Sequence, residues 1–320
     1  MAAFELAIHL GAEWIEIDLV STSGGALVVR HENELSTTTD IARRAGFAHR
    51  RTSRAVDGML LEGWFTEDFS LDELSTVGAA EPLPRLRRLS AGHDGLYGIP
   101  TLDDVLTLME RVNARRDVPV GLYLELKHPS HFASRGLDPV GALLTDLERH
   151  DLLAADAPVL VEASEIAVLR DLAARSPMRL TQLVDAAGGP FDARGGSGSP
   201  TYDQMCTPAG LSEIASYAQF IGASKTQVLP RRRERLGVPT PLIADAHEAG
   251  LGVHVWTMRD ENAYLPRDMR RGLSRRAKGD AATEYRALFD AGVDGVFTDF
   301  VDTALYAREQ WHDERVTSTG

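Results

Sequence analysis

The stretch Trp14-Ile-Glu-Ile-Asp-Leu-Val20 alternates apolar and acidic residues. Side chains two positions apart share a face of a β-strand, so Glu16 and Asp18 point the same way and the apolar residues around them are left to pack. Gly24-Gly25 then predicts a hairpin that brings His31 back to about the level of Asp18. Carboxylates on an otherwise apolar strand favour an active site, because burying them without partners is costly. A solvated strand end with a surface salt bridge is the alternative.

A second apolar strand, Val120–Leu126, also ends in charged residues, Glu125 and Lys127, and is followed by Pro129. Three carboxylates, Glu16, Asp18 and Glu125, would make an all-oxygen site that suits Ca²⁺ or Mg²⁺ and not zinc. A lysine and a histidine nearby indicate an anionic substrate. Only 3 of the 34 basic residues are lysines, which hints that position 127 requires a compact ammonium group. An ordinary ion pair between Lys127 and Glu125 remains open.

Composition limits the classes of partner. The 320-residue chain has a formal net charge of −13, which argues against nucleic acid and against an anionic membrane surface. A phosphate would therefore have to be neutralised locally, by a metal or by a few placed cations. Cys206 is the only cysteine, so no intramolecular disulfide is expected. No apolar stretch approaches the ~18 residues of a membrane helix, and we expect no signal peptide at Met1, where a helical pattern begins.

Strands and helices alternate along the chain, which predicts a parallel sheet. The predicted strands are 14–20, 120–126, 158–163, 179–184, 219–224, 251–257 and 293–298. The predicted helices are 1–11, 101–113, 139–150, 165–175, 211–217, 241–249 and 283–291. This pattern fits an α/β fold of the TIM (β/α)₈ barrel type, whose sites lie where strands end. The eighth strand, the first of the barrel, is expected upstream of Met1.

Two irregular regions interrupt this pattern, and we expect a single domain over 1–320. A long insert at about 36–98, called the cap insert below, follows the hairpin and is predicted to form a small irregular cap over the pocket. A glycine-rich loop is expected at 186–199.

Six segments in order carry a family resemblance. They are Gly11–Val20, Leu27–Glu32, Ile99–Leu102, Leu124–Lys127, Val253–Thr257 and Gly292–Asp299. Together they resemble the glycerophosphodiester phosphodiesterases, with the closest likeness to the secreted bacterial type. The resemblance implies a barrel that hydrolyses glycerophosphodiesters to glycerol 3-phosphate and an alcohol with the help of Ca²⁺ or Mg²⁺. It also implies a location in the periplasm or outside the cell.

The same resemblance implies roles for individual residues. Glu16, Asp18 and Glu125 correspond to metal ligands, His31 to one of two acid/base histidines, and Lys127 to a phosphate contact. Members of the family begin with a strand ending in His-Arg-Gly that is not in this sequence. We therefore expect the activity of this chain to be reduced, since losing an acid/base group typically costs ~10²–10⁴-fold.

Two further positions attract attention. Trp256, at a predicted strand end, is a candidate for packing against the glycerol or the alcohol group, with barrel core as the alternative. The segment Val161-Glu-Ala-Ser164 departs from the Gln-Ser-Phe strand end that is usual in the family, which puts local substrate contacts there in doubt.

Two other functions stay open at this point. A related barrel could act on lysophospholipid or sphingomyelin head groups, which would require an apolar trough near the cap insert. A chain without the first strand could also be a non-catalytic, metal-dependent binding protein. In each case the expected partner is a small molecule, and nucleic acid is not expected.

Overall fold

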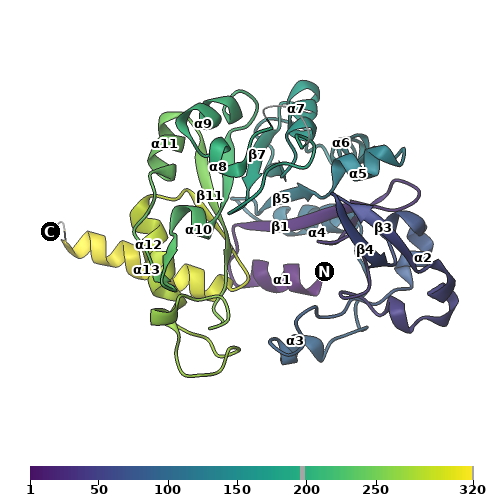
Figure 1. The fold of residues 1–320 in the computed structure, drawn as a ribbon, viewed down its shortest axis with the longest axis horizontal. Coiled ribbons are helices and arrows are strands. Elements are labelled where there is room, and N and C mark those ends of the chain that lie inside the picture. The colour runs from purple at the N-terminus through teal and green to yellow at the C-terminus, as the bar shows by residue number, and fades with distance from the viewer. Residues whose placement is uncertain (195–198, 319–320) are drawn as a thin grey trace. The chain divides into compact units, whose positions relative to one another are not determined.

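The computed structural model describes residues 1–194 and 199–318 (Figure 1). The contacts among these residues group into two compact units. Unit 1 holds residues 14–178 together with Met1, and unit 2 holds residues 2–13 and the chain from 179 onward. Part of the glycine-rich loop expected at 186–199, residues 195–198, lies outside the described residues.

Unit 1 contains a sheet with the strand order β6-β5-β1-β2. Strands β1 (Trp14–Ser21), β5 (Gly121–Leu126) and β6 (Val159–Ala163) are parallel, and β2 (Leu27–Val29) returns antiparallel to β1. Every residue of β5 and β6 is buried, as expected for parallel strands covered on both faces. The register places Asp18 opposite Glu125, and Glu125 opposite Glu162. Three acidic positions therefore lie in one row across three strands.

Four helices follow these strands in unit 1: α4 (Leu102–Asn113), α5 (Pro129–Ser134), α6 (Pro139–Arg149) and α7 (Ile166–Arg175). Helix α4 begins at a capping box, in which the Thr101 hydroxyl accepts from the Asp104 backbone N–H and the Asp104 carboxylate accepts from the Thr101 N–H.

The cap insert is folded, so the prediction of an irregular segment was wrong. It contains strands β3 (Thr52–Val56) and β4 (Met59–Gly63), helices α2 (Leu71–Ser75) and α3 (Arg88–Ala91), and the 3₁₀ turns η1 (Ile41–Arg43), η2 (Ala45–Arg50) and η3 (Thr66–Asp68). Asp57 and Gly58 join β3 to β4 with φ angles of +48° and +81°. Asp-Gly favours this two-residue hairpin turn, in which both central residues have positive φ.

The cap insert shares a hydrophobic core with the strands and helix beside it. Its buried side chains include Trp64, Phe69 and Leu74, and they cluster with Val20 of β1, Val28 of β2 and Phe132 of α5. Phe69 is fully buried and meets Phe47 edge to face, with ring centroids 5.2 Å apart. The cap insert is therefore an integral layer of unit 1.

The main strands of unit 2 are parallel and lie in the order β12-β11-β8-β7. Its strands are β7 (Arg179–Val184), β8 (Phe220–Ser224), β11 (Gly252–Met258) and β12 (Gly295–Thr298). Its helices are α1 (Ala2–His9), α8 (Tyr202–Met205), α9 (Pro208–Ile214), α10 (Lys225–Val228), α11 (Leu242–Glu248), α12 (Ala281–Ala291) and α13 (Val301–Ser318). A short hairpin, β9 (Arg231–Arg232) and β10 (Arg235–Leu236), and the turn η4 (Arg267–Met269) complete it.

All seven predicted parallel strands are confirmed, three in unit 1 and four in unit 2. The helix predicted at 211–217 instead begins at Pro208. The Thr207 hydroxyl caps it and proline occupies its first turn, a start signal that the prediction overlooked. Within residues 1–194 and 199–318, no helix is both long enough and apolar enough to cross a membrane.

The shared core predicts that the cap insert contributes to the stability of the unit as a whole. Phe69→Ala should lower the free energy of unfolding by about 3–5 kcal/mol, because it removes a fully buried ring and leaves a cavity. Leu60→Ala, at a side chain that is 77% exposed on β4, should change it by no more than about 0.5 kcal/mol. Urea denaturation followed by circular dichroism measures both, and equal effects would contradict the shared core.

Candidate metal centre

Three carboxylates lie together at the ends of two neighbouring strands. Glu16 and Asp18 come from β1, where they alternate with buried isoleucines, and Glu125 comes from β5. Each of the three residues offers one oxygen, and these oxygens lie within 4.8 Å of one another. Glu16 is exposed, Asp18 is half-buried and Glu125 is buried. The structure thus brings together all three residues that were predicted as metal ligands, while their role as ligands stays a prediction.

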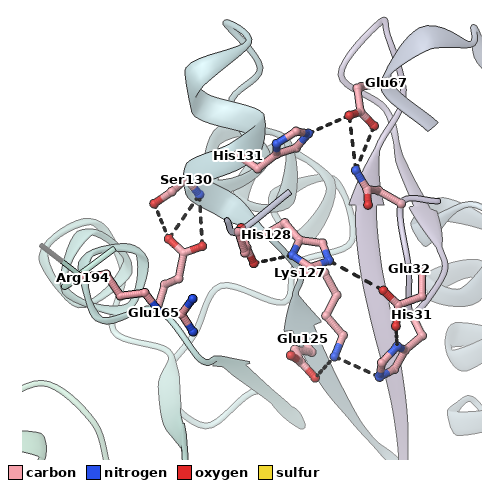
Figure 2. Close-up of polar contacts among 12 residues, drawn as sticks. His31, Glu32, Glu67, Glu125, Lys127, His128, Ser130, His131, Glu165 and Arg194 are labelled. Atoms are coloured by element: carbon pink, nitrogen blue, oxygen red, sulfur yellow. Dashed lines mark hydrogen bonds and ion pairs between the residues drawn. The ribbon is translucent and has the colours of Figure 1, made fainter. Parts of the chain in front are cut away.

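Lys127 lies against two of these carboxylates. Its Nζ is 2.8 Å from Glu125 Oε2 (Figure 2). It is 3.1 Å from Asp18 Oδ1, and only 14% of the Lys127 side chain is exposed. Burial alone would lower the pKa of Lys127, but attraction to Glu125 and Asp18 outweighs it, so the pKa lies above its usual value. The predicted ion pair with Glu125 therefore exists, and it includes Asp18 as well.

At Glu125 the effect of burial on the pKa outweighs the attraction to Lys127. Burial, together with repulsion from Asp18, raises the pKa of the Glu125 carboxyl, and Lys127 only partly offsets the rise. More positive charge at this cluster would therefore be favourable.

His31 lies on the other side of Lys127, as the predicted hairpin register requires. Leu19 pairs with Val29, and the Arg30 backbone N–H donates to the Asp18 carbonyl. The His31 Nε2 is 3.4 Å from Lys127 Nζ, and its Nδ1 is 2.7 Å from Glu32 Oε1. The hydrogen bond to Glu32 raises the pKa of His31, against burial and the nearby Lys127 charge.

Trp256 belongs to β11 of unit 2. Its indole N–H donates to the Gly222 carbonyl of β8, at 3.0 Å. That hydrogen bond holds the Trp256 ring against the neighbouring strand β8. Its predicted contact with the glycerol or the alcohol group remains a prediction.

Glu162 is a charged residue of this region that the sequence reasoning did not assign to the site. It stands on β6 opposite Glu125, is only 2% exposed, and its Oε2 has no hydrogen-bond partner among the described residues. Burial raises its pKa well above the usual value, and repulsion from Glu125 and Glu16 adds to the rise. A lone glutamate in the apolar run Val159–Ala163 was the available signal.

The donor set fits a hard divalent cation. All three clustered side chains offer carboxylate oxygen, the ligand that Ca²⁺ and Mg²⁺ prefer. Glu16, Asp18 and Glu125 carry three negative charges when ionised, and Lys127 carries one positive charge, which leaves a net charge of −2. One divalent cation would neutralise that charge.

Solved structures resemble this chain over nearly its whole length. A protein of Silicibacter pomeroyi matches with a TM-score of 0.63 and 19% identity, covering 95% of this chain and 85% of its own. An Oleispira antarctica phosphodiesterase, solved with the product sn-glycerol-3-phosphate, matches with a TM-score of 0.61 and 17% identity, covering 96% and 90%. The fold is therefore that of the α/β (TIM-type) barrel, as the sequence predicted.

The sequence comparisons narrow this class to one family. The model of the glycerophosphoryl diester phosphodiesterase family matches residues 1–303. A glycerophosphodiester phosphodiesterase of Arabidopsis thaliana is 30% identical over 309 residues, covering 93% of this chain and 78% of its own. The chain belongs to the glycerophosphoryl diester phosphodiesterase family and is a phosphoric diester hydrolase.

The buried Glu162, whose Oε2 lacks a hydrogen-bond partner among the described residues, predicts a measurable effect on stability in metal-free protein. Its pKa in the folded protein lies above the usual 4.5, so the stability it contributes is present below that pH and is lost as the pH rises. Glu162→Gln should therefore raise the melting temperature at about pH 8 and leave it nearly unchanged at about pH 4. Differential scanning calorimetry with a chelator present measures this shift.

Glu148→Gln, at an exposed position on α6, is the matched control and should change nothing at either pH. A Glu162→Gln protein that melts below the wild type at about pH 8 would show that the ionised carboxylate is stabilised by a partner.

Proposed function

We propose that this chain hydrolyses glycerophosphodiesters to glycerol 3-phosphate and an alcohol at the cluster of Glu16, Asp18 and Glu125, with one Ca²⁺ or Mg²⁺ ion bound there. The observation that carries the proposal is the convergence of three carboxylates within 4.8 Å beside a buried lysine. Family membership supports the diester class of substrate. The sn-glycerol-3-phosphate in the Oleispira antarctica phosphodiesterase supports this choice of product.

Charge balance supports a divalent ion and an anionic substrate together. The three carboxylates and Lys127 sum to −2, so a divalent ion would bring the centre to zero, and the single charge of a phosphodiester would then no longer be repelled. When bound, such an ion supplies electrostatic stabilisation of the charge that develops on the phosphoryl oxygens.

Lys127 and His31 would perform the remaining chemistry. The Lys127 ammonium can donate N–H groups to a phosphate oxygen, adding to the stabilisation of the transition state. The His31 Nε2 is 3.4 Å from that ammonium. It can therefore transfer a proton to or from a substrate oxygen that lies beside Lys127.

The first step of the proposed reaction uses the substrate's own 2-hydroxyl. Its oxygen forms a bond to phosphorus as the bond to the departing alcohol breaks, its proton passes to a base, and an acid protonates the alcohol oxygen. Water then opens the cyclic phosphate. His31 would supply one of these proton transfers. The aromatic contact by Trp256 and a periplasmic or extracellular location remain predictions from the sequence.

Removing a cluster carboxylate should abolish metal binding and strongly reduce activity. Glu125→Gln should lose Ca²⁺ binding by calorimetry and lower kcat/KM for glycerophosphocholine by about 10² or more, measured as glycerol 3-phosphate release. Glu148→Gln on the exposed face of α6 should keep both. Chelation of the wild type should stop turnover, and adding Ca²⁺ or Mg²⁺ should restore it.

Full turnover by protein shown to be metal-free by elemental analysis would reject the metal-dependent reaction. Faster turnover of lysophosphatidylcholine than of glycerophosphocholine would instead favour the head-group alternative.

A substitution of Lys127 can distinguish metal binding by the carboxylates from phosphate binding by the lysine. Lys127→Met should lower kcat by about 10²–10³, the usual cost of losing one donor to a developing oxyanion. It should nevertheless bind Ca²⁺ at least as tightly as the wild type, because a cation that shares Asp18 and Glu125 has been removed. Calorimetry and initial rates test this, and loss of Ca²⁺ binding would show that Lys127 is needed to build the metal centre.

A further inference from the structure

Two carboxylate–histidine pairs meet at Glu32, just after β2 (Figure 2). Glu32 Oε1 is 2.7 Å from His31 Nδ1, and Glu32 Oε2 is 4.0 Å from His128 Nε2. The other ring nitrogen of His128, Nδ1, is 2.6 Å from Oδ2 of Asp57. A continuous chain of polar contacts therefore runs from the β3–β4 turn through His128 and Glu32 to His31.

We propose that Glu32 is a positioning residue for His31, and that the cap insert holds Glu32 in place through Asp57 and His128. The proton-transfer role of His31 is taken from the proposed function. The new element is that Glu32 and the cap insert orient the His31 ring.

The contacts of His31 specify one tautomer. A carboxylate can only accept, so Glu32 requires a hydrogen on Nδ1. The Lys127 ammonium can only donate, so it requires a lone pair on Nε2, 3.4 Å away. The charged groups that face His31 are Glu32, Lys127 and Asp18. A phosphate oxygen that drew the Lys127 N–H away would leave the Nε2 lone pair free to take a proton.

The contact between His128 and Asp57 includes an unusual backbone conformation at His128. The φ angle of His128 is +51°, a region that residues other than glycine seldom adopt, whereas the φ angle of +48° at Asp57 is that of the Asp-Gly turn. Such conformations persist where the surroundings fix them, and they are often found at functional sites. Both side chains are mostly buried, with their imidazole and carboxylate in contact.

A second contact between the same elements supports the tie. His131, one turn further along α5, is 2.6 Å from Glu67 Oε1, and Glu67 also accepts from Asn33, the residue after Glu32. Arg54 of β3 donates to the same carboxylate at 2.8 Å. Helix α5, the cap insert and the segment carrying His31 are thus joined at two neighbouring points.

The first test observes His31 directly and does not depend on turnover. Nitrogen-15 NMR of the histidine rings should show His31 with its proton on Nδ1 in the wild type, assigned by comparison with His31→Gln. Glu32→Ala should lower the fraction of His31 rings that carry the proton on Nδ1, because the acceptor at Nδ1 is gone and only the 3.4 Å contact with Lys127 still favours that tautomer. Glu62→Ala, an exposed carboxylate on β4 that pairs with Arg51, should leave the His31 signals unchanged.

The second test measures turnover of glycerophosphocholine. Glu32→Ala should lower kcat by about 10–100-fold with little change in KM, the cost typical of carboxylates that orient metal-bound histidines. Glu32→Asp should recover part of the loss, Asp57→Asn should lower kcat less than Glu32→Ala does, and Glu62→Ala should have no effect.

The results distinguish failure of the positioning role of Glu32 from failure of the proton-transfer role of His31. A wild-type His31 protonated on Nε2, or full kcat in Glu32→Ala while His31→Gln is inactive, would overturn the positioning role. Full activity in His31→Gln would instead remove His31 from the reaction, whatever the NMR result.

Discussion

Mutual repulsion among acidic side chains governs the centre of unit 1. The parallel register places Asp18 beside Glu125 and Glu125 beside Glu162, so charge accumulates where apolar strands end. Lys127 compensates for part of it, with its ammonium within 3.1 Å of two carboxylates. Glu162, without such a partner among the described residues, has a strongly raised pKa. The repulsion that costs stability in the folded chain would be relieved by a bound cation.

The strands and the three carboxylates could be predicted because both depend on local pattern. Apolar runs bounded by turns define strands, and the alternation of acidic with apolar residues in β1 fixes which side chains share a face. Glu162 was harder to interpret, because its neighbours across the sheet follow only from the register of β5 on β6. The Asp57-Gly58 turn carried a clear local signal, but the many polar residues around it obscured the strands on either side.

Contacts that depend on side-chain rotamers could not be predicted from the sequence. His31 and Glu32 are neighbours in the chain, yet nothing in their order requires the ring to face that carboxylate. The approach of His128 to both Glu32 and Asp57 joins positions about 100 and 70 residues apart, and it exists only because the cap insert packs on α5 and β2. The cap insert therefore supports both the fold and the geometry of the site.

The core that the cap insert shares with β1, β2 and α5 limits how such a segment can diverge among relatives. A separately folding lid could be exchanged by recombination at its two ends. Here a transplanted segment would also have to match Val20, Val28 and Phe132 beneath it, and would have to supply a carboxylate for His128. Substitutions in the cap insert should therefore accumulate on its outer side chains, while the apolar side chains that face Val20, Val28 and Phe132 change slowly.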